Sequence, residues 1–245
     1  KIVSLTAYSK NIAKILDKYC DIILVGDSMA NVLYGMPNTH QLKISNIIQH
    51  GISVRKGIKK SLMVVDMPKG TYTTPFQAKK NAKLIKKKTK CDAVKIESNN
   101  KNFKIIKEII KAKIPVMGHI GFTPQFKKNF NVEGKNSFEI KKLINEALLI
   151  EKAGAFSVVL ECVTPYTART ITNILKIPTI GIGSSSHCDG QVLVTDDILG
   201  LSGFYPKFIK RYVNLTTIIE KAVKKYSKDV KTKVFPNNKN FLYGK

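Results

Sequence analysis

Short apolar runs alternate with longer amphipathic stretches along the chain. The runs are rich in β-branched residues and carry the continuous apolar character of strands that are buried on both faces. Eight such runs are found, at residues 2–7, 22–25, 62–65, 93–96, 115–118, 157–160, 178–182 and 192–194. The pattern therefore predicts eight short strands that share a parallel sheet.

Helical periodicity fills many of the segments between these runs. Pro75 opens one of them, at the first helical position, where its missing N–H costs nothing. Apolar positions fall mostly on one face of each segment, which predicts helices over residues 44–56, 75–88, 137–153, 167–175 and 208–228. Strands that alternate with helices indicate parallel βαβ units.

Right-handed crossovers allow these units to form either a closed (β/α)8 barrel or an open, doubly wound sheet. The length of 245 residues and the count of eight runs favour the TIM barrel. No glycine-rich phosphate-binding motif follows the first run, which weakens the open sheet. No linker divides the chain, so we expect one barrel domain over residues 1–245, with a C-terminal extension from about residue 229.

Composition narrows the class of protein further. Hydrophobic residues make up 43% of the chain, which is typical of a globular protein. No apolar stretch reaches the roughly 18 residues that a membrane span needs, and no signal-peptide pattern opens the sequence. The four cysteines are widely spaced without a CxxC motif. We therefore expect reduced thiols, a cytoplasmic location and no membrane partner.

Charge suggests a second class of function, because 42 basic residues against 17 acidic ones give a net charge of +25. Such an excess is typical of a protein that binds polyanions. However, only three of the basic residues are arginine, the side chain that specific nucleic-acid readers favour. We expect a solvated lysine surface and no specific nucleic-acid partner. Binding to polyanions through lysine stays the non-enzymatic alternative, and steep salt dependence would support it.

The scarce acids are placed more informatively, because four of them follow apolar runs: Asp27, Asp66, Glu97 and Glu161. Strand C-termini in a barrel open onto one face, where active sites form. Carboxylates that converge there repel one another unless they share a cation or a proton. A single aspartate after a strand, in contrast, is often only the N-cap of the next helix.

The neighbours of these acids add to the candidate site. Lys95 lies two residues before Glu97, so both point to the same side of their strand. His119 ends the next run, and Ser28 follows Asp27 directly. A lone histidine is more often a core or rim residue than a functional one.

The arrangement favours a hard divalent ion held by oxygen atoms of Asp27 and Asp66, with Glu97 close by. Mg²⁺ takes one or two carboxylates directly and completes its shell with water and substrate oxygens. Such an ion could bind a 2-oxo acid and stabilise an enolate. Lys95 could balance the substrate carboxylate, and Glu161 could act as the general base.

Several strings of the sequence match one family in order and at compatible spacings. On these strings the chain resembles the ketopantoate (3-methyl-2-oxobutanoate) hydroxymethyltransferases from residue 2 to about residue 212. The matching strings are TAYS at 6–9, LVGDS at 24–28, VVDMP at 64–68, VKIES at 94–98, GHIGFTPQ at 118–125, VLECV at 159–163, IPTIGIG at 177–183, DGQVLV at 189–194 and PKF at 206–208.

The resemblance implies a (β/α)8 barrel of the phosphoenolpyruvate/pyruvate superfamily. It implies transfer of a hydroxymethyl group from 5,10-methylenetetrahydrofolate to 3-methyl-2-oxobutanoate, which gives 2-dehydropantoate for pantothenate and coenzyme A synthesis. It also implies a homodecamer. A C–C lyase or mutase of the isocitrate-lyase-like barrels, acting on a small 2-oxo acid, is the enzymatic alternative. Those enzymes should lack the VLECV and GHIGFTPQ strings.

The same resemblance implies roles for individual residues. Asp27 and Asp66 would bind Mg²⁺, and Glu97 would complete the metal environment. Contacts to the oxo acid would come from Asp27, Ser28, Asp66 and Lys95. Glu161 would be the proton acceptor, and His119 would lie near the transferred hydroxymethyl group.

The chain departs from the family pattern at the rim of the predicted site. Ser9 stands where aspartate is common, and Lys69 replaces part of the usual DLPF-Gly-Ser-Tyr string. Residues 126–136 form a shorter segment than usual, with Glu133 in place of glutamine, and a serine pair at 184–185 replaces Ala-Gly. We expect these changes to affect the folate contacts and leave the reaction class intact.

Overall fold

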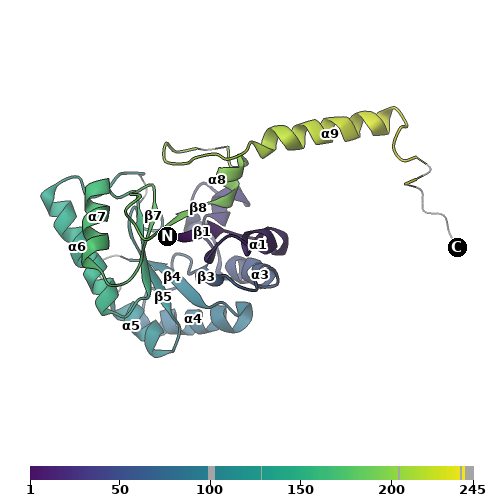
Figure 1. Ribbon diagram of the computed structural model, residues 1–245. Coiled ribbons are helices and arrows are strands. Elements are labelled where there is room, and N and C mark those ends of the chain that lie inside the picture. The colour runs from purple at the N-terminus through teal and green to yellow at the C-terminus, as the bar shows by residue number, and fades with distance from the viewer. Residues whose placement is uncertain (99–102, 128, 204, 238, 241–245) are drawn as a thin grey trace. The chain divides into compact units, whose positions relative to one another are not determined.

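The computed structural model describes residues 1–98, 103–127, 129–203, 205–237 and 239–240. The chain divides into two compact units, Lys1–Thr195 and Asp196–Lys245. The first unit holds a closed barrel of eight parallel strands that pair in sequence order, with β8 returning to β1 (Figure 1). The (β/α)8 barrel predicted from the sequence is confirmed.

Each strand falls on one of the predicted apolar runs. The ends differ by up to three residues, because main-chain pairing extends strands beyond their apolar positions. The strands are β1 Ile2–Thr6, β2 Ile22–Val25, β3 Leu62–Asp66, β4 Ala93–Glu97, β5 Val116–Gly121, β6 Ser157–Glu161, β7 Thr179–Ile182 and β8 Gly190–Leu193.

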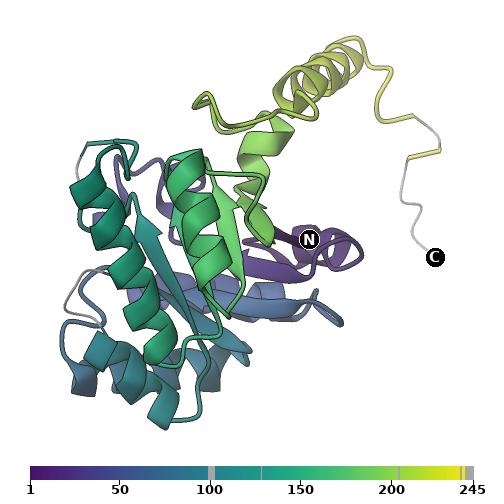
Figure 2. The ribbon, with the colours of Figure 1, turned by 60° about the vertical axis from the view of Figure 1, so that its left-hand side comes forward.

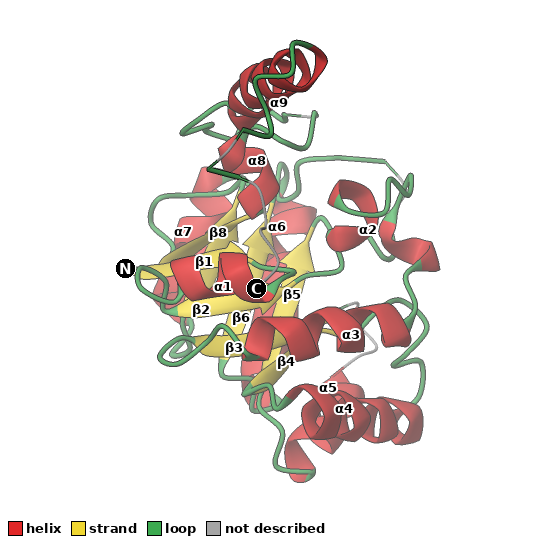
Figure 3. Ribbon diagram, turned by 90° about the vertical axis from the view of Figure 1, so that its right-hand side faces the viewer, coloured by secondary structure: helices red, strands yellow, loops and turns green. Residues whose placement is uncertain are grey.

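Helices lie on the outside of these strands in the first unit, as Figures 2 and 3 show. Four predicted helices appear close to their expected bounds, as α3 Ile44–Arg55, α4 Pro75–Thr89, α6 Ser137–Lys152 and α7 Pro165–Ile174. The pattern missed the short elements α1 Lys10–Leu16, α2 Met29–Val32, η1 Thr39–Gln41, α5 Phe103–Lys111 and α8 Thr195–Leu199.

The fifth predicted helix was misplaced. It was expected over residues 208–228, but α9 covers Leu215–Lys231. Its N-cap is Asn214, whose side chain accepts a hydrogen bond from the backbone N–H of Thr217. This cap satisfies one of the free donors at the helix start, so the helix begins later than its apolar pattern.

The alternation of side chains along the strands builds the barrel interior in layers. A small apolar cluster fills the part of the interior nearer the strand N-termini. It is made by Ile22, Leu24, Val64, Ala93, Met117, Val159, Ile180 and Val192. Positions two residues further along these strands point to the same side. They carry Asp66, Lys95, His119 and Glu161, so a polar layer follows the apolar one toward the strand C-termini.

A larger apolar cluster lies between the strands and the helices. Ile23, Val65 and Val94 on the strands are fully buried in it, as are Ile106 of α5 and Ile150 of α6. Burying each such side chain contributes about 1.5–3 kcal/mol. This shell fixes the strands and therefore the positions of the polar groups inside the barrel.

The second unit, Asp196–Lys245, contains α9, and none of the side chains of this helix is buried. The predicted extension overlaps the end of α9, and its residues 238 and 241–245 lie outside the described residues. The assignment of a single barrel domain with an extension from about residue 229 stays a prediction. No helix in the described part of the chain is both long and apolar enough to cross a membrane.

Candidate active site

Strand register brings together the first two site residues. Asp66 at the end of β3 is the register partner of Lys95 in β4. The Lys95 ammonium lies 2.8 Å from the Asp66 Oδ1 atom, and both side chains are buried. Among the lysines that the structure describes, Lys95 is the only buried one, and its role in the site stays a prediction.

Asp27 lies two residues after β2 and joins this pair. Its backbone N–H donates to the Asp66 Oδ2 atom at 2.9 Å, and its side chain is buried. It does not cap the following helix, since Ser28 occupies the N-cap position of α2. The Ser28 hydroxyl is hydrogen-bonded to the Tyr8 hydroxyl at 2.8 Å, which places it beside Asp27 at the rim.

Gln125 connects Asp27 to Glu97, and the sequence analysis missed it as a site residue. Its backbone N–H donates to the Glu97 Oε2 atom at 2.9 Å, and its side-chain Nε2 donates to the Asp27 Oδ2 atom at 2.8 Å. The Tyr72 hydroxyl donates to its Oε1 atom at 2.6 Å. The only signal in the sequence was its place at the end of the GHIGFTPQ string.

His119 connects the other two acids. It pairs in register with Glu97, and its Nδ1 atom lies 3.9 Å from Glu97 Oε1. Its Nε2 atom lies 3.1 Å from Glu161 Oε2. Glu161 ends β6 and is the more open of the two acids, with 17% of its side chain exposed. The structure therefore brings six of the seven predicted side chains into one series of contacts, with Ser28 beside it.

Gly121 supports the position of Glu161 from the neighbouring strand. Its φ of +92° lies in the left-handed region, which favours glycine. A Cβ atom at this position would overlap the carbonyl oxygen of Glu161. The close approach of the two strand ends therefore requires glycine here.

Burial dominates the electrostatics of the acids. Burial and the nearby Asp66 charge raise the pKa of Asp27 to about 7. Burial and the Asp27 charge also raise the pKa of Glu97 well above its usual value. Both effects arise because a charged carboxylate loses solvation in the barrel and faces another carboxylate.

The two basic groups respond in opposite directions. Burial opposes the charge of Lys95, but the charges of Asp66 and Asp27 outweigh it and raise the pKa of Lys95, so this ammonium stays protonated. Burial and the Lys95 charge lower the pKa of His119, so its imidazole is neutral near pH 7. The site thus combines one fixed cation with a neutral imidazole.

The donor set fits a divalent cation. Three buried carboxylates, those of Asp27, Asp66 and Glu97, accompany one buried ammonium among the described residues, so the acids outnumber the fixed cation. No group of three or more His, Cys, Asp and Glu side chains within the described ranges is placed to ligate one ion together. Mg²⁺ commonly takes only one or two carboxylates directly.

Comparisons with known proteins identify the family. The family model of ketopantoate hydroxymethyltransferase matches residues 1–238. A 3-methyl-2-oxobutanoate hydroxymethyltransferase of Pelagibacter ubique is 53% identical over 98% of this chain and 93% of that protein. The protein of the same name from Phenylobacterium zucineum is 44% identical over 100% of this chain and 90% of its own length. The chain belongs to the ketopantoate hydroxymethyltransferase family. It is therefore a hydroxymethyltransferase, as the sequence motifs predicted.

Solved structures of other enzymes share this barrel fold. A phosphoenolpyruvate phosphomutase from Streptomyces platensis superposes with a TM-score of 0.65 at 12% identity, covering 95% of this chain and 83% of that one. A phosphonopyruvate hydrolase in complex with oxalate and Mg²⁺ gives a TM-score of 0.61 at 12% identity, covering 98% and 88%. Identity this low indicates a shared barrel fold only.

Several rim positions that depart from the usual hydroxymethyltransferase pattern are engaged in local contacts. The Lys69 ammonium lies 3.2 Å from His40 Nδ1, and Glu133 forms an ion pair of 2.8 Å with Lys127. Ser9 occupies the N-cap position of α1 without a side-chain cap hydrogen bond. The effect of these positions on folate binding stays a prediction.

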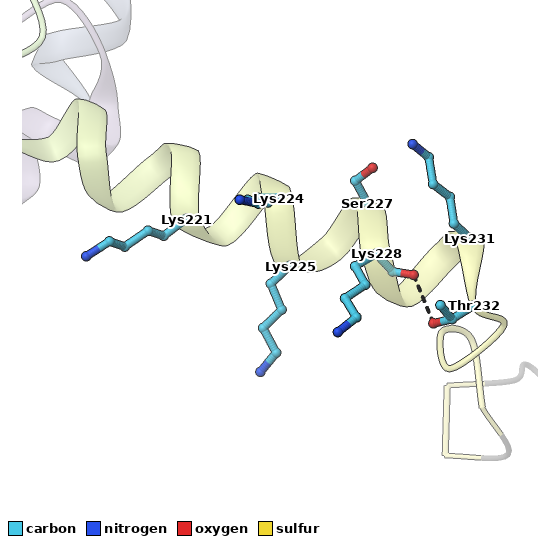
Figure 4. A pocket seen from close by; sticks show the side chains of 7 residues that line it. All are labelled: Lys221, Lys224, Lys225, Ser227, Lys228, Lys231 and Thr232. Carbon is cyan, nitrogen blue, oxygen red and sulfur yellow. Dashed lines mark hydrogen bonds between the residues drawn. The ribbon is translucent and has the colours of Figure 1, made fainter.

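Lysines also line an open depression along α9 of this hydroxymethyltransferase, away from the acids described above in sequence. Figure 4 shows five lysine side chains that extend from the helix beside Ser227 and Thr232. They are Lys221, Lys224, Lys225, Lys228 and Lys231. This part of the helix carries more positive than negative charge, since Asp229 is the one acidic residue between Lys221 and Lys231. Non-specific binding of polyanions by the lysine surface as a whole stays a prediction.

Proposed function

We propose that this hydroxymethyltransferase transfers the one-carbon unit of 5,10-methylenetetrahydrofolate to 3-methyl-2-oxobutanoate and forms 2-dehydropantoate, the precursor of pantothenate. The observation that carries the proposal is the buried Asp66–Lys95 pair at the C-terminal end of the strands, in one series of contacts with the other three predicted acids. The names of the relatives at 44–53% identity support the same reaction.

The proposed cofactor is Mg²⁺, held by Asp27 and Asp66, with Glu97 completing its surroundings through Gln125. When bound, the cation would supply positive charge to the keto and carboxylate oxygens of the oxo acid. Oxygen ligands of this type also accept Mn²⁺, which makes Mn²⁺ a useful probe.

Lys95 and Ser28 would help to bind the oxo acid. The Lys95 ammonium keeps its charge inside the barrel, where it balances the carboxylate of the substrate. Ser28 presents a hydroxyl at the rim, next to Asp27. The ammonium and the hydroxyl both donate hydrogen bonds, so they suit the acceptor oxygens of a 2-oxo acid.

Glu161 would accept the proton from C3 of the oxo acid. It is the most open of the four acids, and the neutral His119 imidazole lies 3.1 Å away, where it can orient the carboxylate. The resulting carbanion at C3 forms a bond to the one-carbon unit. Tetrahydrofolate leaves, and water supplies the oxygen of the new hydroxyl group.

The alternative reaction is C–C cleavage or intramolecular rearrangement of a small oxo acid, and it would use the same kind of barrel. The solved mutase and hydrolase structures that share the fold are only 12% identical to this chain. The relatives with high identity carry the transferase name, which favours the transfer reaction. We further propose a cytoplasmic homodecamer, as the family resemblance implies.

One assay tests this proposal. Purified protein is mixed with Mg²⁺, 5,10-methylenetetrahydrofolate and 3-methyl-2-oxobutanoate, and both tetrahydrofolate and 2-dehydropantoate are measured. We expect equal amounts of the two products, and loss of both when the oxo acid or the metal is omitted. Cleavage of the oxo acid without consumption of folate would instead support the lyase alternative.

A further inference from the structure

Gln125 joins two carboxylates that come from different strands. Its backbone N–H reaches Glu97 at the end of β4, and its side chain reaches Asp27 beyond β2. Only 1% of Gln125 is exposed. One residue therefore sets the separation between two acids that no strand pairing connects directly.

A turn after β5 holds the backbone of Gln125 in place. The backbone N–H groups of Phe126 and Lys127 both donate to the carbonyl oxygen of Thr123 at 2.9 Å. The imidazole of His40 donates from Nε2 to the carbonyl oxygen of Pro124 at 2.9 Å. These bonds fix the residues on either side of Gln125, so its N–H keeps its direction toward Glu97.

Two acceptors and the Tyr72 hydroxyl determine which way the Gln125 amide faces. The Nε2 atom lies against two acceptors, Asp27 Oδ2 at 2.8 Å and the carbonyl oxygen of Met67 at 3.1 Å. The Oε1 atom accepts from the Tyr72 hydroxyl at 2.6 Å. An amide turned over would place its oxygen against these two acceptors. The Tyr72 hydroxyl can donate or accept, and by donating to Oε1 it adds to the preference for the orientation that donates to Asp27.

We propose that Gln125 is a positioning residue that fixes the Asp27 and Glu97 carboxylates relative to each other, and that the Tyr72 hydroxyl helps to hold the orientation of its amide. The consequence for metal binding rests on the proposed function, in which Asp27 holds the cation. The positioning itself does not rest on it.

Mn²⁺ binding to the purified protein, measured by titration calorimetry without substrates, tests the consequence. Tyr72→Phe removes only the hydroxyl, and Gln125→Met removes the amide at nearly constant length. We expect each to weaken Mn²⁺ binding by about 10- to 100-fold, the usual effect of losing a group that orients a metal ligand. Tyr19→Phe and Gln191→Met, at exposed positions of the barrel unit, are matched controls that should bind as the wild type does.

A crystal structure of metal-free Tyr72→Phe tests the positioning independently. We expect the contact between Gln125 Nε2 and Asp27 Oδ2 to open beyond about 3.5 Å, the limit of a hydrogen bond. An unchanged contact would overturn the proposal, and so would wild-type Mn²⁺ affinity in both folded variants. If the wild-type protein binds no Mn²⁺ at all, the proposed metal fails, while the crystal structure still decides the role of Tyr72.

Discussion

Asp66 and Lys95 face each other across β3 and β4 and form a buried ion pair with a distance of 2.8 Å between oxygen and nitrogen. Their register fixes this pair, because each lies on the inward side of its strand, two residues beyond the apolar layer. The Asp66 carboxylate also accepts from the backbone of Asp27. Asp66 therefore connects the buried Lys95 ammonium to Asp27, the other proposed metal ligand.

Asp66→Asn keeps the shape of this side chain and removes its charge. We expect the free energy of unfolding to fall, because loss of one partner of a buried pair costs about 3–5 kcal/mol when the other charge is left uncompensated. Asp27 and Glu97 still compensate the Lys95 charge, so the loss of unfolding free energy should lie near the lower end of this range. We also expect kcat/KM to fall by at least about 100-fold, as when an essential electrostatic group is removed.

Urea unfolding and steady-state kinetics measure these two effects. Glu108→Gln is the control, since Glu108 forms an ion pair with Lys79 at the surface of the helical layer. It removes the same kind of charge and should leave turnover unchanged. Normal turnover in a folded Asp66→Asn or Asp66→Ala protein would contradict the assignment of Asp66 to the site.

Metal affinity should depend on pH through Asp27. Burial and Asp66 raise its pKa to about 7, so this carboxylate holds a proton below that value and must lose it to bind a cation. We expect Mn²⁺ affinity to rise by up to about tenfold for each pH unit below pH 7 and to level off above it. Titration calorimetry from about pH 6 to pH 8 measures this slope. An affinity that does not change over this range would contradict the assignment of Asp27 as a ligand.

Gly121→Ala should destabilise the barrel strongly. The φ of +92° disfavours any side chain, and the added Cβ atom would also overlap the carbonyl oxygen of Glu161. Gly70→Ala is a matched control, because Gly70 has a φ of +79° with no atom within 4 Å of an added Cβ. We expect Gly70→Ala to cost about 1 kcal/mol and Gly121→Ala at least about twice as much in the free energy of unfolding. Equal costs in urea unfolding would show that the contact with Glu161 contributes nothing.

Asp17 makes the free energy of unfolding depend on pH in the acidic range. Burial alone would raise its pKa, but the backbone N–H groups of residues 59–61 donate to its carboxylate, outweigh this effect and lower the pKa to about 2. A lowered pKa gives stability that is present above the unfolded value of about 3.8 and is lost as pH falls toward 2.

We therefore expect Asp17→Asn to lower the free energy of unfolding by about 1–2 kcal/mol at neutral pH. The difference from the wild type should shrink as pH falls from about 4 to 2, where the wild-type carboxylate is protonated as well. Urea unfolding over this range measures the difference. A difference that stays constant down to the lowest pH would contradict the role of the Asp17 charge.

The sequence predicted the barrel well because its strands are buried on both faces and appear as continuous apolar runs. The acids at the strand ends could also be predicted to converge, since all parallel strands of a barrel end on one face. Short helices such as α1, with seven residues, were missed because they hold too few turns to show a helical period. The start of α9 depends on the cap at Asn214, which outweighs the apolar pattern before it.

Gln125 shows why part of the site could not be predicted. Its residue type carries no charge and titrates in no useful range, so a search for acids and bases passes over it. Its importance comes from the turn at residues 123–127, which aims its backbone and side chain at two acids far away in the sequence. Only the three-dimensional arrangement shows this.

The most direct test of the account is the exchange of the C3 hydrogen of 3-methyl-2-oxobutanoate in D₂O, followed by proton NMR with Mg²⁺ present and folate absent. The wild-type protein should catalyse the exchange, and Glu161→Gln, which keeps the shape of the side chain, should slow it by about 100-fold or more, the usual contribution of a general base. Exchange at the wild-type rate in folded Glu161→Gln protein, or no exchange with the wild-type protein, would contradict proton removal by Glu161 at this site.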